Sequence, residues 1–466
     1  MNIKKAVLKV FSVNAFQLVS SLVVGFFVPA ILSIEGYADL KTYALYMSYA
    51  GLFHFGFLDG IYIKYGGKKY NEIDKKTLKS EHNFLLLMEC IVSICIFILS
   101  LIIKKVTMFI FAISIIPYML SSFFQMIFQA TGEFKKYSRI MYIYTFVYMV
   151  TNVFLAFILK NTNYIYYCLT TYIANIAEVI FVEIKFLKEN KRIKPEYDKK
   201  NIITNFKVGI LVMVGNLAVI GFFGIDKWFV KLFLTTEDFA YYSFAVSMLN
   251  VINTLINAIS ITFYSYLFEN NTEKNINKLK NYLMIIGGGA SLAFFVLSFI
   301  VNTFISKYKP ALNIVSITFS TFPYMILINS LYVNLYKVNK DEKKYFKVVV
   351  SMFILAIVYN IIAIIIFKNT ISIAIATVLT LITWVIYSTH DLKKVNWSFG
   401  MYGYLFSLTI CFIVFSTNFS WLKGGICYLI AYILLTCIFE KDTLKDMGQM
   451  IKKEMNKRKK AFQKAE

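Results

Sequence analysis

Charge is scarce in this chain, and that scarcity excludes an ordinary soluble protein. Asp, Glu, Lys and Arg make up only 16% of the 466 residues, while 58% are hydrophobic and 18% are aromatic. A soluble domain needs a polar surface around its core and is about one-quarter charged. Disorder is excluded as well, because disordered chains lack the aromatic and branched residues that are abundant here. The composition therefore predicts a protein whose solvent is mostly lipid.

The motifs of catalytic and metal sites are also missing. The three histidines, His54, His82 and His390, lie far apart, and the six cysteines contain no Cys-x-x-Cys pair and fall inside apolar segments. There is no Gly-rich phosphate loop, and the longest loop, near residues 188–201, is too short for a catalytic domain. We therefore predict a protein that is not an enzyme and that holds no metal and no cofactor.

Apolar runs long enough to cross a bilayer recur along the whole chain. A crossing helix needs roughly 20 mainly apolar residues. Fourteen segments meet this requirement: 10–32, 40–63, 83–103, 107–130, 140–159, 165–187, 204–224, 240–263, 282–303, 311–336, 347–367, 371–390, 401–417 and 422–439. The first lacks a small-residue cleavage site and is interpreted as a retained helix. We predict an all-α polytopic membrane protein with about 14 transmembrane helices.

The excess of cations over acids, 49 against 26, indicates the orientation of these spans. With a cytoplasmic N-terminus, 39 of the 49 Lys and Arg residues fall on the cytoplasmic side of the predicted topology. This bias follows the positive-inside rule and places both termini in the cytoplasm. The net charge of +23 is thereby explained by membrane insertion, and we predict no nucleic-acid partner.

Short segments recur at a nearly constant offset. Residues 133–139, between spans 4 and 5, are similar to residues 341–347, between spans 10 and 11, and Gly-Phe-Phe occurs at both 25–27 and 221–223. We expect two copies of a six-helix unit in the same orientation, as in parallel-repeat transporters. The predicted domains are an N-terminal lobe (1–200), a C-terminal lobe (201–395), two extra helices (396–440) and a cytoplasmic amphipathic basic tail (441–466).

Several of these features together resemble a known family. Residues 57–61 (Phe-Leu-Asp-Gly-Ile) end span 2, residues 237–242 (Glu-Asp-Phe-Ala-Tyr-Tyr) lead into span 8, and a turn occupies residues 132–139. With the fourteen-span topology, they resemble the polysaccharide transporter branch of the multidrug/oligosaccharidyl-lipid/polysaccharide (MOP) flippase superfamily, which includes the Wzx-like O-antigen flippases. The resemblance implies a V-shaped pair of six-helix lobes with two extra helices.

The resemblance also implies a function in the bacterial plasma membrane. The expected activity is translocation, by alternating access, of undecaprenyl-diphosphate-linked oligosaccharide for capsule, O-antigen, teichoic-acid-like polymer or exopolysaccharide. The expected partners are this lipid-linked oligosaccharide, anionic membrane lipids and other polysaccharide assembly proteins, and the protein is expected to be a monomer. Coupling to an H⁺ or Na⁺ gradient stays open. Two alternatives are a cation-coupled multidrug antiporter of the same superfamily and, from another class, a membrane glycan polymerase or ligase, which the short loops disfavour.

Polar residues inside the spans mark a candidate substrate cavity, because such residues normally face a bundle interior or water. Those on spans 1, 2 and 8 are Asn14, Gln17, Ser21, His54, Ser247, Asn250, Asn253, Thr254 and Asn257. The residues of span 8 form one polar helix face, which favours a water-filled cavity over isolated polar contacts between helices. His54 is either a cavity donor or a neutral core histidine.

Charged candidates are fewer. Glu178 lies deep in span 6, where it is either a coupling acid, as in the related drug antiporters, or a hydrogen-bonding group between helices. A diphosphate also requires cations, and the middle of spans 1 and 8 has none. The candidates are Lys9, Lys64, Arg139, Lys207, Lys227 and Lys231, each of which is also explained as a topology or lipid-headgroup residue.

Overall fold

The computed structural model describes residues 3–449, and every regular element in that range is helical. The elements are α1 (Ile3–Ile31), α2 (Ile34–Ser48), η1 (Ala50–His54), α3 (Phe57–Tyr65), η2 (Tyr70–Glu72), α4 (Lys75–Ile103), α5 (Val106–Ala130), α6 (Phe134–Val153), η3 (Phe154–Ile158), α7 (Tyr164–Asn190), α8 (Lys199–Phe222), α9 (Ile225–Phe233), α10 (Thr236–Glu269), α11 (Glu273–Ala290), α12 (Ala293–Phe304), η4 (Ser306–Tyr308), α13 (Ala311–Phe319), α14 (Phe322–Leu327), η5 (Ile328–Tyr332), α15 (Val333–Val338), α16 (Glu342–Ile366), α17 (Thr370–Asp391), α18 (Phe399–Asn418) and α19 (Trp421–Phe439).

The chain packs as two units. The first comprises Met1–Lys227 and Thr235–Ser243, and the second comprises Trp228–Leu234 and Phe244–Glu466. The predicted amphipathic tail falls in the second unit, where residues 441–449 are helical and residues 450–466 lie outside the described range.

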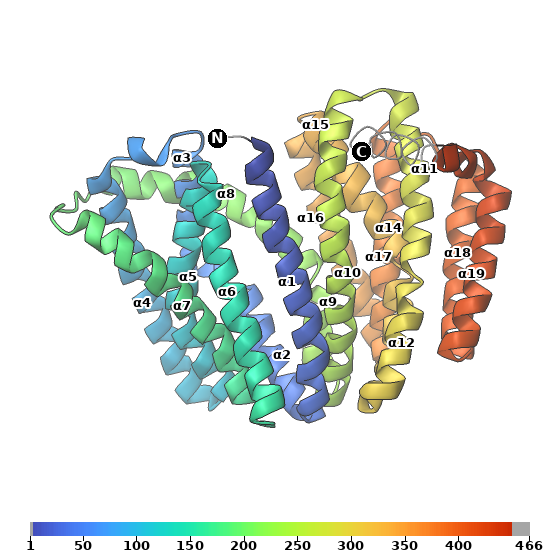
Figure 1. Ribbon diagram of the computed structural model, residues 1–466, viewed down its shortest axis with the longest axis horizontal. Helices are drawn as coiled ribbons and strands as arrows, with labels where there is room; N and C mark the ends of the chain where they lie inside the picture. Colours follow the sequence, from blue (N-terminus) through green and yellow to red (C-terminus); the bar gives the residue numbers. More distant parts are fainter. Residues whose placement is uncertain (1–2, 450–466) are drawn as a thin grey trace, which may run out of the picture. The chain divides into compact units, whose positions relative to one another are not determined.

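In the first unit, long helices run side by side around α5 (Figure 1). α5 packs against α4 and α7, while α6 packs against α1 and α7. Phe111, Phe123, Phe124 and Phe128 of α5 are buried in the hydrophobic core of this unit. A helix that is apolar on all sides is suited to this central place, because each of its faces meets a neighbour.

In the second unit, α11 is the helix to which the last hairpin is attached. α11 carries three successive glycines, and a Cβ on Gly287 would lie 2.6 Å from the Cα of Pro323 in α14. On another side, the hydroxyls of Tyr428 and Tyr432 in α19 donate hydrogen bonds of 2.9 Å to the carbonyl oxygens of Gly288 and Ile285. The predicted extra helices therefore pack within the second unit.

A buried cation holds the connection between α17 and α18. The ammonium group of Lys280 in α11 is buried, donates to the carbonyl oxygen of Asn396 and lies 5.2 Å from the centre of the Trp397 ring. Asn396 also donates through its backbone N–H to the side chain of Asn277, at 2.8 Å. These contacts dock the connecting segment on α11.

The fold class is confirmed, but the count of fourteen spans is not. Among the described residues, 11 helices are long and apolar enough to cross a membrane, and a bent pair, Ala311–Phe319 with Phe322–Val338, raises the number to 12. The predicted span 40–63 does not add to this count because η1 divides it into α2 and α3. The predicted span 240–263 lies within α10, which is not among those helices.

Candidate functional site

The break in the second predicted span lies inside the first unit. After η1, Phe55 and Gly56 adopt left-handed backbone conformations with φ values of 51° and 85°. The buried His54 closes the break, because its Nδ1 accepts a hydrogen bond of 3.0 Å from the backbone N–H of Gly56. The sequence predicts His54 as a cavity residue, but one of its two ring nitrogens is occupied by this backbone hydrogen bond.

Beyond the break, α3 and α8 cross with their backbones in contact. A Cβ on Gly209 of α8 would lie 1.8 Å from the carbonyl oxygen of Gly56, and a Cβ on Gly60 would lie 2.0 Å from that of Asn205. Small residues allow helices to approach this closely in membranes. The crossing brings the polar side chains of α3 and α8 together.

Glu81 is the centre of a polar network at this crossing. Its carboxylate is fully buried and accepts hydrogen bonds of 2.7 Å from Lys64, 2.7 Å from Tyr65 and 2.9 Å from Asn205. Lys64 also donates to the side chain of Asn201 at 2.9 Å. The network joins α3, α4 and α8, and its charged pair has the additional hydrogen bonds that a buried ion pair needs.

A second polar group lies nearer the break. The carboxylate of Asp59 is 3.7 Å from Nε2 of His54 and accepts a hydrogen bond of 3.4 Å from Asn216 of α8. Asp59 and His54 are both buried. Both acids near the α3–α8 crossing, Glu81 and Asp59, therefore accept hydrogen bonds from side chains of the protein.

Glu178 of α7 has different surroundings. Gln125 of α5 donates to its Oε1 at 2.8 Å and to Ser121 at 2.9 Å. The other oxygen, Oε2, is buried and has no hydrogen-bond partner. A buried polar atom without a partner is uncommon and calls for an explanation. Asn175, one turn away, donates to the backbone of Thr171 instead.

The cations predicted to contact phosphate have unequal surroundings. Lys64 is engaged by Glu81 and Asn201 and would have to leave this carboxylate to reach a phosphate. Arg139 and Lys207 are exposed, whereas Lys227 and Lys231 are half-buried. The side chain of Lys9 lies outside the described residues. Contact of any of them with a phosphate stays a prediction.

The predicted polar faces of α1 and α10 are partly described. On α1, Asn14 and Gln17 are half-buried and Ser21 is exposed. On α10, the residues range from half-buried to exposed: Ser247, Asn253 and Thr254 are half-buried and Asn250 is exposed. Thr254 donates to the backbone oxygen of Asn250 at 2.9 Å, and the buried Oδ1 of Asn253 has no partner. The side chain of Asn257 lies outside the described residues. Their role as one cavity stays a prediction.

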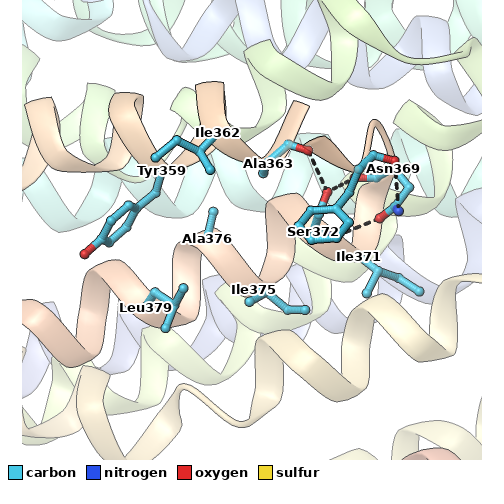
Figure 2. Close-up of a pocket in the computed structure, with 10 residues that line it drawn as sticks. Tyr359, Ile362, Ala363, Asn369, Ile371, Ser372, Ile375, Ala376 and Leu379 are labelled. Carbon is cyan, nitrogen blue, oxygen red and sulfur yellow. Dashed lines mark hydrogen bonds between the residues drawn. The ribbon is translucent and has the colours of Figure 1, made fainter. Parts of the chain in front are cut away.

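The second unit contains apolar grooves. One groove, between α16 and α17, has a volume of about 220 Å³. Figure 2 shows the side chains that line it, which are mainly aliphatic, such as Ile362, Ile375 and Leu379. Its polar atoms are used locally, because Ser372 donates through its N–H to the side chain of Asn369 and through its hydroxyl to backbone oxygens. Another groove, of about 320 Å³, lies between α14, α17 and α18. Such surfaces suit hydrocarbon rather than sugar.

Sequence reasoning did not predict the network around Glu81. The predicted third span begins at residue 83, whereas α4 begins at Lys75, so the sequence pattern places Glu81 outside the helix that carries it. The spacing of the histidines in the sequence predicts that His82 is isolated, but its Nε2 lies 3.1 Å from the carboxylate of Glu183 in α7. A signal was present: Glu81 and His82 directly precede the apolar run, where a helix commonly extends beyond its hydrophobic segment.

The fold is similar to that of solved flippase and multidrug-transporter structures. The described chain is similar to a structure of the lipid II flippase MurJ in an inward closed conformation, with a TM-score of 0.67, 16% identity, and coverage of 94% of this chain and 99% of that one. It is also similar to an outward-facing multidrug resistance MATE family transporter, with a TM-score of 0.51, 12% identity, and coverage of 84% and 96%.

The sequence comparison defines the family. Residues 3–270 match the family model described as polysaccharide biosynthesis protein, and the chain therefore belongs to that family. No curated protein matches the sequence. The predicted resemblance to a polysaccharide branch of the MOP superfamily is confirmed.

Proposed function

We propose that this protein is a flippase that moves undecaprenyl-diphosphate-linked oligosaccharide across the bacterial plasma membrane by alternating access. The observation that carries the proposal is the match to a polysaccharide biosynthesis family in a chain whose fold covers 99% of a lipid II flippase. A glycan on a lipid carrier satisfies both. Its glycan would be a repeat unit of capsule, O-antigen, teichoic-acid-like polymer or exopolysaccharide.

The division of polar and apolar surfaces supports this substrate class. A lipid-linked glycan has a polar headgroup, which is costly to expose to hydrocarbon, and a polyprenyl chain, which is costly to expose to water. The interior of the first unit buries several acids and histidines, while two grooves of about 220 and 320 Å³ in the second unit are apolar and a third, of about 460 Å³, is lined by polar residues such as Glu273 and Asn277. The chain offers each part of such a lipid a compatible surface.

We further propose the setting in which the flippase works. Both termini face the cytoplasm, because most Lys and Arg residues then lie on the cytoplasmic side. The protein is a monomeric transporter without enzyme activity, and its basic cytoplasmic surface contacts anionic lipids and other polysaccharide assembly proteins.

Deletion of the gene tests the proposal. We expect glycan-bearing undecaprenyl diphosphate to accumulate in the cytoplasmic leaflet and surface polysaccharide to fall, and restoration of the wild-type gene should reverse both changes. Lipid extraction with leaflet-selective labelling measures the first and surface glycan staining the second. Normal surface glycan without accumulation of the intermediate would contradict the proposal.

A cation-coupled multidrug antiporter is the second candidate. It is favoured by the buried, partly unpartnered carboxyl of Glu178, because such a group can bind and release a proton or Na⁺. In this case Glu178→Gln should abolish drug resistance conferred by the overexpressed protein and leave surface glycan unchanged. Loss of glycan export without any drug phenotype would exclude it.

A further inference from the structure

α6 carries a row of tyrosines on one face. Tyr137, Tyr144 and Tyr148 are spaced seven and four residues apart, which places them on the same side of the helix. The rings of Tyr144 and Tyr148 are parallel, with an interplanar angle of 3° and centroids 6.0 Å apart. Both side chains are half-buried rather than closed off. α6 therefore presents accessible, parallel aromatic surfaces.

These tyrosines face the interior of the first unit. α6 packs against α7 and α5, the helices that carry Glu178 and Gln125. Asn152 of α6 donates to Thr170 of α7 at 2.9 Å, and about two turns further along each of these antiparallel helices Tyr144 is level with Glu178. The neighbouring positions Phe146 and Val150 of α6 are instead 57% and 43% exposed, as lipid-facing residues are. The row of tyrosines is consequently directed at α5 and α7, not at lipid.

The carboxyl group of Glu178, which has one oxygen free to accept a hydrogen bond, lies on α7 beside this row of tyrosines. Glu178 is 1% exposed, and its Oε2 has no partner while Oε1 is held by Gln125. A buried oxygen without a hydrogen-bond partner is costly, because it has lost its hydration and gained nothing in exchange. A ligand that donates a hydrogen bond at this place would remove the penalty.

The combination of groups indicates the chemistry of that ligand. A pyranose ring has apolar C–H faces, which suit flat aromatic surfaces, and a rim of hydroxyls, which donate to carboxylates and accept from amides and phenols. An acyl chain would leave Oε2 of the Glu178 carboxyl without a partner. A metal ion would need more anionic ligands, and the described residues contain no group of three His, Cys, Asp or Glu side chains that could hold one.

We propose that the tyrosine face of α6, together with Gln125 and Glu178, is a subsite that binds a sugar ring of the transported glycan. This inference rests on the proposed flippase function and specifies where in the first unit the glycan is recognised. Tyr144 and Tyr148 supply the stacking surface, Oε2 of Glu178 accepts a hydrogen bond from a ring hydroxyl, and Gln125 holds the carboxyl in position.

Binding by the purified full-length protein in nanodiscs tests the subsite. The two probes are undecaprenyl-diphosphoryl-N-acetylglucosamine and undecaprenyl diphosphate, which differ only in the sugar. The double variant Tyr144→Leu/Tyr148→Leu should raise the Kd of the sugar-bearing probe about tenfold, as expected for the loss of two aromatic contacts, and leave the Kd of the sugar-free probe unchanged. The variant Tyr144→Phe/Tyr148→Phe, which retains the rings, should bind the sugar-bearing probe within about threefold of wild type.

Tyr142→Leu is the matched control on the same helix. Tyr142 donates to Ser12 of α1 and packs on Phe16, away from the proposed subsite, so its loss should change neither Kd. If the leucine double variant does not fold, the two single leucine variants replace it. Equal affinity of wild type and leucine variants for the sugar-bearing probe would overturn the subsite while leaving the flippase proposal intact. Failure of wild type to bind either probe would count against both.

Discussion

The interiors of the two units are held together by different chemistry. Among the described residues, the first unit buries five acids and two histidines: Asp59, Glu81, Glu89, Glu178, Asp226, His54 and His82. In the described part of the second unit, Lys280 and Glu440 are the buried charged residues. Its helices are joined mainly by hydroxyl groups, as where Tyr428 donates to the backbone of Gly288 and Tyr404 pairs with Thr436.

This difference shows that two all-helical units of one chain can have different interiors. Buried carboxyl groups are costly unless donors surround them, and the first unit provides such donors for Glu81, in Lys64 and Asn205, and for Glu178, in Gln125. Hydroxyl contacts between helices cost less to bury. Recognition of a polar headgroup is therefore better matched to the first unit.

The largest effect is expected at the α3–α8 crossing, which supports the charged interior of the first unit. Gly209→Ala would place a methyl group 1.8 Å from a backbone oxygen that cannot move away cheaply. We expect a destabilisation of at least about 3 kcal/mol and little folded protein. Gly289→Ala in the second unit, whose nearest neighbour is 3.4 Å away, should be tolerated. The yield of detergent-solubilised protein and its size-exclusion profile measure the effect of each variant. Equal yields of folded protein for the two variants would contradict the predicted difference.

The next effect concerns the ion pair itself. Glu81→Gln removes the counter-charge of Lys64 and one strong acceptor from a fully buried position. We expect a loss of about 2 kcal/mol, within the range for a buried group left poorly paired. The exposed pair of Glu196 with Lys76, at 4.0 Å, is the control, and Glu196→Gln should cost less than about 1 kcal/mol. Thermal unfolding in one detergent compares them. A loss no larger than that of the control would show that Glu81 is dispensable.

The corresponding test in the second unit is the buried cation. Lys280→Met leaves the carbonyl of Asn396 without its donor but also removes the cost of burying an ammonium group. We expect a net loss of about 1 kcal/mol, with faster hydrogen exchange confined to residues 392–398. Lys274→Met, at an exposed position of the same helix, should change neither stability nor exchange. Increased exchange throughout the unit would mean that Lys280 supports more than this segment.

The smallest effect is expected at the surface, where the tail contacts α11. Hydrogen bonds from Lys278 and Tyr282 hold the pKa of Asp446 below its ordinary value. A lowered pKa means that the contact is strengthened above about pH 4 and is lost as the pH falls through the folded-state pKa. A spin label at Gly448, in a variant without native cysteines, should become more mobile at low pH. Asp446→Asn should show that mobility already at pH 7, and no change in either would refute the contact.

The fold was largely predictable because the thickness of the bilayer sets the minimum length of an apolar run that can cross it. Eleven predicted spans coincide with long apolar helices, and a twelfth with the bent pair. The break after His54 was not predicted, because it depends on the backbone of Phe55 and Gly56 rather than on hydropathy. Helix ends were also underestimated, since polar residues such as Glu81 belong to a helix without belonging to its apolar run.

The candidate site was less predictable for a related reason. Polar stripes such as that of α10 are visible in the sequence, but tyrosines in an apolar helix do not reveal which face is turned inward. Tyr144 and Tyr148 are half-buried and Phe146 is exposed because of where the neighbouring helices pack on α6. Lys64 was identified as a candidate cation, but its pairing with Glu81 depends on the crossing of α3 with α8, which the sequence does not display.

The break between α2 and α3 has a consequence for how the protein is made. With a rise of about 1.5 Å per residue, the 15 residues of α2 and the 9 of α3 are each too short to cross a hydrocarbon core of about 30 Å. The segment also carries two buried polar residues, His54 and Asp59. We expect the insertion machinery to release it poorly until α4 and α8 have been synthesised and can supply its partners. Biogenesis of the first unit should therefore proceed as one late event, after residue 222 has left the ribosome.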